Sequence, residues 1–395
     1  MDTQLFSKNF LLATLINFFI ALNYYLLMVV IAVYAMHQFG SPPGEAGLAA
    51  GIFVIGTLFG RLFAGKWALS VGLKRMLVAG LAANLCMAGF YFVSDAILSL
   101  FLIRFLHGAG FGVASNTAAT IVVNTLPKSR YGEGLGYFML GVTVAMAIGP
   151  YIGILLGNQG NFTLVFIASA AAGASSLLIA LFLHVEDPVL SADQLNEMKG
   201  FGIHTFLETR AISIAIVCAI IFLCYSGILS FITPFSQEAD VVRAASFFFL
   251  VYAAVVFVSR PFVGRLFDVR GENIAMYPAI FLFSMGMILL SQVRHGYMLL
   301  AASVLLGLGT GSIQSVGQAI AVKLTPSHRL GLANSTYFIF VDMGVGIGPL
   351  LFGLIVPFIG YRGIYLGAGV IAFACLLLYY LVHGRYAVTP DRHTS

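Results

Sequence analysis

The sequence predicts an all-α integral membrane protein whose twelve transmembrane helices form two six-helix bundles related by an internal repeat. The first observation is the composition: 60% of the 395 residues are hydrophobic, 9% are charged and the mean hydropathy is +0.99. A soluble domain carries about 25% charged residues, so this chain cannot cover a water-facing surface and needs the bilayer as its solvent. The other two observations are a series of long apolar runs and a repeat of 199 residues.

Twelve runs of about 20 apolar residues follow one another, each long enough to cross a hydrocarbon layer as a helix. The first six cover residues 10–36, 46–67, 76–93, 97–124, 134–157 and 162–184. The second six cover residues 211–235, 244–266, 274–292, 297–324, 332–357 and 362–383. The first run is too long for the core of a signal peptide and has no small-residue cleavage site, so we expect it to remain as a helix.

Eight landmark residues recur at one fixed spacing, which indicates that the two halves are copies of one another. The first set is Arg61, Gly65, Gly72, Gly108, Gly110, Pro127, Arg130 and Pro150, and the second is Arg260, Gly264, Gly271, Gly307, Gly309, Pro326, Arg329 and Pro349. The copies meet at the longest polar stretch. We therefore expect bundles at 1–184 and 211–383, a cytoplasmic connector at 185–210 along the membrane surface, and a cytoplasmic tail at 384–395. In so apolar a chain, this repeat is typical of a transporter whose substrate path lies between two bundles near mid-membrane.

The charged residues predict the orientation and exclude other classes of protein. With the loops placed alternately, fourteen of the twenty Lys and Arg residues fall on the side of the amino terminus and three on the opposite side, which predicts that both termini are cytoplasmic. The net charge of +5 therefore reflects topology, and we expect no nucleic-acid partner. The four cysteines lie within apolar runs, where we interpret them as packing residues. The sequence contains no metal-ligand spacing, ATP-binding loop or nucleophile motif, so we expect no cofactor, no metal and no enzyme activity.

Two polar loops, one in each copy, combine glycines and cations in the same order. The first is RLFAGKWALSVGLKR, from Arg61 to Arg75, and the second is RPFVGRLFDVRGEN, from Arg260 to Asn273. In each loop one glycine allows helices to approach closely and another, seven residues later, supplies a tight turn. We expect each loop to clamp neighbouring helices on the cytoplasmic side, with Asp268 paired to a nearby arginine or to a helix N-terminus. The residues of the clamps are Arg61, Gly65, Gly72, Lys74 and Arg75 in the first copy and Arg260, Gly264, Asp268 and Gly271 in the second.

These loops resemble the signature loop of the major facilitator superfamily, and two further stretches agree. RFLHGAGFGVAS (104–115) is similar to the Arg-x-x-x-Gly-x-Gly pattern of that superfamily's fourth helix. GVTVAMAIGPYIG (141–153) is similar to the fifth-helix Gly-Pro-x-x-Gly motif of proton-driven exporters in the twelve-helix drug-antiporter group. The motif residues are Gly149, Pro150 and Gly153, and run eleven repeats them as Gly348 and Pro349.

The resemblance covers nearly the whole chain and implies a monomeric transporter with six plus six helices. It has one departure in the signature loop. The family's loop aspartate falls at Leu69 in the first copy and is present only as Asp268 in the second. The first clamp therefore lacks its acid, and we expect its closed-state lock to be weaker or to be carried by the second copy.

Ionisable residues inside the apolar runs are few, and each is a candidate for proton coupling because a charge at mid-bilayer costs at least about 2.5–3.5 kcal/mol. Arg104 lies on a run that lines the central cavity in the superfamily; its alternative role is a structural one, bonded to backbone carbonyls. Asp342, the only acid well inside a run, is a candidate proton carrier because burial favours its neutral form. Its alternative is a permanent pair with a cation such as Arg61. His107 follows Arg104 by about one helical turn and titrates near neutral pH, with a packing role as its alternative.

Neutral polar and aromatic residues on runs one, four, seven and ten are candidates for a substrate cavity. They are Asn17, Asn23, Tyr24, Tyr25, Asn116, Thr120, Tyr225, Gln314 and Gln318. As a set they predict a mostly apolar site with scattered polar groups, the usual make-up of a small-molecule site. For each of them alone, an interhelical hydrogen bond is the alternative.

Together these observations predict a secondary active transporter in a bacterial-type cytoplasmic membrane, with proton-coupled export of a small apolar or amphiphilic compound by alternating access. In the expected cycle an external proton protonates Asp342 as the outward state releases substrate. The open alternatives are an exporter or importer of one metabolite, such as a metallophore, sugar, amino acid or organic anion, and a receptor that binds a ligand without moving it. The duplicated loops argue against the receptor.

Overall fold

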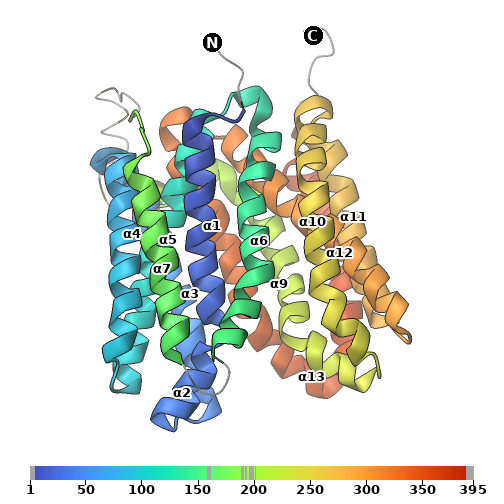
Figure 1. The fold of residues 1–395 in the computed structure, drawn as a ribbon. Helices are drawn as coiled ribbons and strands as arrows, with labels where there is room; N and C mark the ends of the chain where they lie inside the picture. Colours follow the sequence, from blue (N-terminus) through green and yellow to red (C-terminus); the bar gives the residue numbers. More distant parts are fainter. Residues whose placement is uncertain are drawn as a thin grey trace. The chain divides into compact units, whose positions relative to one another are not determined.

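The computed structural model describes residues 5–157, 162–187, 191, 194, 200 and 202–387, and these residues fold almost entirely into helices (Figure 1). The first copy contains α1 (Lys8–Met28), α2 (Ile31–Phe39), α3 (Pro43–Val71), α4 (Leu73–Phe90), α5 (Ile97–Thr125), α6 (Tyr131–Gly157) and α7 (Phe162–Leu181). The second copy contains α9 (Thr209–Glu238), α10 (Val242–Arg270), α11 (Glu272–Ser291), α12 (Gly296–Lys323) and α13 (Leu330–Val382). Short 3-10 turns lie at Tyr91–Val93, Lys128–Arg130, Ile203–Thr205, Ser327–Arg329 and Gly384–Tyr386.

The predicted all-α membrane fold is confirmed. Eleven helical segments of the described residues are long and apolar enough to cross a membrane. One of them, α13, has 53 residues and contains a break at Gly360, where φ is +67°. The break separates predicted runs eleven and twelve, so the described residues contain a helix for each of the twelve predicted runs, and the chain is a multi-pass membrane protein. The first run differs from its prediction, because α1 ends at Met28 and the chain continues as the short helix α2.

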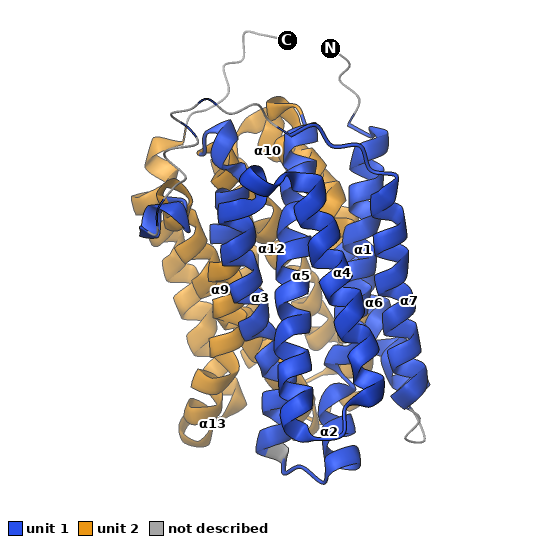
Figure 2. Ribbon diagram, turned by 90° about the vertical axis from the view of Figure 1, so that its left-hand side faces the viewer, with its two compact units in different colours: residues 1–126, 141–208, 325–336 blue, residues 127–140, 209–324, 337–395 orange. Residues whose placement is uncertain are grey.

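The chain divides into two compact units, drawn in different colours in Figure 2. Unit 1 comprises 1–126, 141–208 and 325–336; unit 2 comprises 127–140, 209–324 and 337–395. Two short segments thus leave their own half of the sequence: the first turns of α6 belong to unit 2, and the first turns of α13 belong to unit 1. The bundle boundaries expected at 184 and 211 stay a prediction, as does the tail beyond 384, most of which lies outside the described residues. Of the connector, residues 188–190, 192, 193, 195–199 and 201 lie outside them too.

Glycines bring α3 and α5 of unit 1 together backbone to backbone. A Cβ atom added to Gly108 of α5 would lie 2.0 Å from the carbonyl oxygen of Phe53, and one added to Gly112 would lie 2.3 Å from that of Thr57. In the other direction, a Cβ atom on Gly60 of α3 would lie 2.1 Å from the carbonyl oxygen of Ala109. No larger residue fits there, so the glycine spacing of run four determines how closely α5 approaches α3.

The glycine–proline stretches have the same packing role in both units. In unit 1, α6 approaches α1 through Gly149, whose added Cβ atom would lie 2.6 Å from Cβ of Tyr25. In unit 2, α13 approaches α9 through Gly344 and Gly348, whose added Cβ atoms would lie 2.3 Å from the carbonyl oxygen of Ala219 and 1.8 Å from Oγ of Ser226. The repeat seen in the sequence is therefore also a repeat of helix contacts within each unit.

Candidate functional site

The second-copy clamp lies in unit 2, where α10 meets the first turn of α6. A Cβ atom on Gly264 would lie 2.3 Å from the carbonyl oxygen of Gly132, so the two backbones touch. One turn later, the carboxylate of Asp268 accepts hydrogen bonds from the backbone N–H groups of Gly132 and Glu133, both at 2.8 Å. Of the partners considered for Asp268, the structure therefore shows a helix N-terminus, where a negative charge is stabilised by otherwise unpaired amides. Gly271, with φ +91°, ends α10 in a turn that other residues resist.

Arg260 anchors the same region from the interior of unit 2. Its side chain is 4% exposed, and its Nε donates to the carbonyl oxygen of Gly311 at 3.1 Å. One terminal nitrogen donates to the carbonyl oxygen of Met139 at 2.8 Å, and the other donates to Oε1 of Gln314. Arg260 thus joins α10, α12 and the first turns of α6. Gln314, a predicted cavity residue, is its partner.

The first-copy clamp lies in unit 1, where α3 meets the first turns of α13. A Cβ atom on Gly65 would lie 2.6 Å from Cβ of Ser335, and the Ser335 hydroxyl donates to the carbonyl oxygen of Arg61 at 2.7 Å. Gly72, with φ +99°, separates α3 from α4. Of the cations in this loop, Lys74 donates to the carbonyl oxygen of Leu181 at 3.2 Å, and Arg75 is exposed. The predicted close approach of Gly65 is therefore present, with α13 as its neighbour.

Arg104 is buried in unit 1 between α5 and α3. Its Nε donates to the carbonyl oxygen of Ala49 at 3.0 Å, and one terminal nitrogen lies 3.4 Å from the carbonyl oxygen of Ala50. The guanidinium also lies 4.5 Å from the centre of the Phe53 ring, close enough for a cation–π interaction. These contacts correspond to the structural alternative considered for Arg104.

Tyr91 connects Arg104 to His107. Its hydroxyl accepts from a terminal nitrogen of Arg104 at 3.3 Å and lies 2.9 Å from Nδ1 of His107. Arg104, His107 and Tyr91 are at most 1% exposed. Tyr91 was not among the predicted residues, because a tyrosine at the end of an apolar run gives no signal of its own. Its position 16 residues before His107, across one helical hairpin, is the only hint in the sequence.

Asp342 lies on α13 in the part that belongs to unit 2 and is partly exposed. Arg104 and His107 belong to unit 1. The three proton-coupling candidates are therefore not gathered in one compact unit. Their roles stay a prediction.

The cavity candidates of α1 have different surroundings in unit 1. The amide of Asn23 donates to the carbonyl oxygen of Ser169 at 2.8 Å and to its hydroxyl at 3.1 Å, so it joins α1 to α7 as an interhelical bond. Tyr24 stacks on Phe53 at 5.0 Å between ring centres, and Tyr25 packs edge-on against Tyr24. Asn17 is 5% exposed.

The remaining cavity candidates are buried polar residues on α5, α9 and α12. In unit 1, the amide of Asn116 lies 3.4 Å from the carbonyl oxygen of Gly331, and the hydroxyl of Thr120 donates to the carbonyl oxygen of Asn116. In unit 2, Tyr225 stacks on Tyr252 at 5.7 Å between ring centres, and Gln318 is fully buried.

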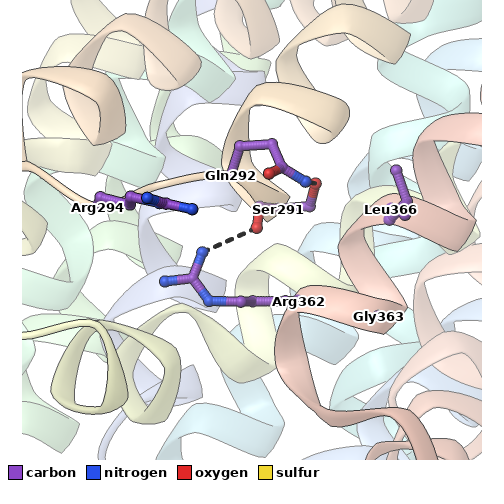
Figure 3. A pocket seen from close by; sticks show the side chains of 6 residues that line it. All are labelled: Ser291, Gln292, Arg294, Arg362, Gly363 and Leu366. Atoms are coloured by element: carbon purple, nitrogen blue, oxygen red, sulfur yellow. Dashed lines mark hydrogen bonds between the residues drawn. The ribbon is translucent and has the colours of Figure 1, made fainter.

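A pocket of about 410 Å³ lies in unit 2 and is shown in Figure 3. It is lined by Ser291, Gln292, Arg294, Arg362, Gly363 and Leu366. The guanidinium of Arg362 donates to the carbonyl oxygens of Ser291 and Val293 at 3.0 Å and 2.7 Å, which satisfies groups at the end of α11 (Figure 3 draws the first of these bonds). The lining includes none of the predicted site residues, so this pocket is separate from them.

The chain is similar to membrane transporters over nearly its full length. A family model described as Major Facilitator Superfamily matches residues 13–296 and 279–394. An uncharacterized MFS-type transporter from Methanocaldococcus jannaschii is 23% identical over 381 residues, which cover 95% of this chain and 98% of the relative. The multi-drug resistance efflux pump PmrA of Streptococcus pneumoniae is 24% identical over 84% of each chain. The solved structure of the human organic anion transporter MFSD10 (TETRAN) has a similar fold, with a TM-score of 0.75 and 13% identity over 94% of this chain and 98% of that one.

Proposed function

This chain belongs to the Major Facilitator Superfamily and is a membrane transporter, and on that premise we propose that it exports a small apolar or amphiphilic compound in exchange for protons. The observation that carries the proposal is the glycine–proline stretch of α6, packed on α1 through Gly149. Its sequence resembles the helix-five motif of proton-driven exporters, and α13 repeats both the motif and the packing. The similarity to the efflux pump PmrA over 84% of the chain gives further support for export.

Asp342 is the proposed proton carrier. It is the only acid well inside an apolar run. There the charged carboxylate costs much more free energy than the neutral carboxyl group, so gain or loss of a proton can favour one state of the carrier over the other. An external proton neutralises it as substrate leaves, and loss of that proton to the cytoplasm resets the carrier. One charge moved through 100 mV releases about 2.3 kcal/mol, which sustains roughly a 50-fold concentration ratio.

The setting of this cycle is a cytoplasmic membrane with both termini inside, as the Lys and Arg bias indicates, and a single chain as the working unit. The second candidate for proton coupling is His107, whose imidazole shares a hydrogen bond with the Tyr91 hydroxyl in the buried cluster that also contains Arg104. The substrate contacts come from the neutral polar residues on α1, α5, α9 and α12.

Proton flux in liposomes tests the proposal directly. Purified protein is reconstituted with a trapped pH-sensitive dye, a proton gradient is imposed, and lipophilic cations, antibiotics, sugars and metal chelates are added in turn. We expect at least one lipophilic compound to drive proton movement in the wild type and in Asp95→Asn, a matched change of an exposed loop acid, but not in Asp342→Asn.

Each other outcome has a definite meaning. Flux that survives in Asp342→Asn but disappears in His107→Gln moves the coupling role to the Arg104 cluster. Flux with a sugar, amino acid or chelate alone replaces drug-type export by transport of one metabolite. No proton flux while labelled compounds still cross the membrane overturns proton coupling.

A further inference from the structure

The two clamps differ in where their acids come from. The second-copy loop carries two acids of its own: Asp268 caps the first turn of α6, and Glu272 begins α11. Glu272 is 4% exposed and accepts from Lys323 at 2.6 Å and from His383. At the equivalent positions, 199 residues earlier, the first copy has Leu69 and Leu73. The first loop therefore lacks both carboxylates.

Asp187, at the start of the connector, stands in for the acid at the beginning of α4. Its Oδ1 accepts from the backbone N–H of Leu73, the first residue of α4, at 2.7 Å. Its other carboxylate oxygen lies 2.8 Å from the place that a Cβ atom added to Gly72 would take, so the carboxylate fills the space beside this glycine. A carboxylate is thus present at the N-terminus of α4, just as Glu272 is at the N-terminus of α11.

Glu208, at the end of the connector, stands in for the acid that faces α13. Its carboxylate pairs with Nε of Arg329, directly before α13, and the two side chains are 3% and 8% exposed. Its backbone N–H donates to the Thr336 hydroxyl in the second turn of α13 at 2.8 Å. Arg329 is held further by the carbonyl oxygen of His204, at 2.7 Å, which also belongs to the connector. Glu208 thus fixes the start of α13 through the Arg329 side chain and the Thr336 hydroxyl, whereas Asp268 fixes the start of α6 through backbone amides.

The connector also binds the cation of the first loop. Lys66 is 5% exposed, donates to the carbonyl oxygen of Gly200 and lies 4.1 Å from the centre of the Phe206 ring. Lys66 is equivalent to Arg265 of the second loop. The connector residues and their partners Lys66, Leu73, Arg329 and Thr336 all lie within unit 1, whereas Arg265 belongs to unit 2.

We propose that the connector is a working part of the first clamp. It supplies from a separate segment the two carboxylates that Leu69 and Leu73 do not provide, and Glu208 is the residue that holds the first turns of α13 on unit 1. Because α13 continues into unit 2 after Thr336, the connector is attached to a helix that both units share. Its use in transport rests on the proposed function, whereas the attachment itself does not.

Hydrogen–deuterium exchange on the full chain in lipid nanodiscs tests the attachment without any substrate. In Glu208→Gln we expect exchange of the backbone amides of residues 203–208 and 330–336 to become about tenfold faster, since a buried ion pair is broken while Arg329 stays charged. Exchange at residues 131–137 should not change. Asp268→Asn is the matched control in the other copy and should loosen 131–137 without affecting 330–336.

A second substitution separates a specific acid requirement from general damage. If the clamp needs a carboxylate near α13, Leu69→Asp, which restores the acid of the first loop, should return the exchange of 330–336 in Glu208→Gln towards the wild-type rate. Wild-type exchange at 330–336 in Glu208→Gln overturns the proposal, and so does equal loosening of both clamps by that change. Because the readout is local exchange, a failed transport assay leaves this result unaffected.

Discussion

Replacing Gly108 by alanine should separate α5 from α3 and weaken the burial of Arg104. A Cβ atom at this position would lie 2.0 Å from the carbonyl oxygen of Phe53, whereas real Cβ contacts essentially never fall below 3.0 Å. This oxygen belongs to the backbone and cannot rotate away, so the helices must move apart by about 1 Å. Arg104 bridges the same two helices, and its bond to Ala50 is already 3.4 Å long.

The expected cost has two parts. Overpacking of a close helix contact costs about 1–3 kcal/mol, and loss of a hydrogen bond from a charged donor costs about 1.5–3 kcal/mol. Together they predict a loss of roughly 2.5–6 kcal/mol in the stability of unit 1. To measure this, protein in detergent is heated in steps and the remaining monodisperse fraction is determined by size-exclusion chromatography. We expect the midpoint temperature of its loss to fall by at least about 5 °C.

Gly89→Ala is the matched control. Gly89 lies in α4, and no atom comes within 4 Å of an added Cβ, so alanine should leave the midpoint unchanged or raise it slightly through its better helix propensity. Gly60→Ala, whose Cβ would lie 2.1 Å from the carbonyl oxygen of Ala109, should behave like Gly108→Ala. If Gly108→Ala melts with the wild type and with Gly89→Ala, the steric account of this helix pair is wrong.

Three further predictions use the same heating assay. Asn23→Leu removes the bonds from α1 to α7 and should cost about 1–2 kcal/mol; transport lost at unchanged stability would instead place Asn23 in the substrate site. Glu272→Gln should lower the midpoint more than Arg130→Gln, because the Glu272 carboxylate is buried and bonded to both Lys323 and His383, whereas Arg130 belongs to a partly exposed pair worth at most about 1 kcal/mol. Equal shifts in these two variants would contradict the burial argument. Arg260→Lys should destabilise unit 2, because an ammonium group cannot reproduce three bonds made by a planar guanidinium; a wild-type midpoint would show that the charge alone suffices.

The sequence was most informative where a feature depends on local spacing. Gly65 and Gly264 were expected at close helix approaches, and both lie there. Gly72 and Gly271 were expected in turns, and both have positive φ. For Asp268 a helix N-terminus was one of the stated partners, because a carboxylate near the end of a helix has few other ways to be satisfied.

What the sequence did not predict are contacts between residues far apart in the chain. Glu208 and Arg329 are separated by 121 positions, and nothing in the connector distinguishes Glu208 from its other acids. Tyr91 beside Arg104 and Gln314 beside Arg260 were missed as partners for a related reason. A transmembrane helix that is apolar on all sides gives no periodic signal, so the sequence does not show which of its faces meets a given neighbour.

The two copies differ in acids but agree in glycines, and the reason is physical. A close backbone approach needs a residue without a side chain at that position, and no other segment can supply it, so Gly65 and Gly264 both remain glycine. A carboxylate acts through space and can reach a helix N-terminus from any segment that packs nearby. The connector exists only once, between the copies, and its described residues Asp187, Gly200 and Phe206 contact the first loop. Leu69 is therefore tolerated where Glu208 supplies the charge, whereas the second loop has to carry Asp268 itself.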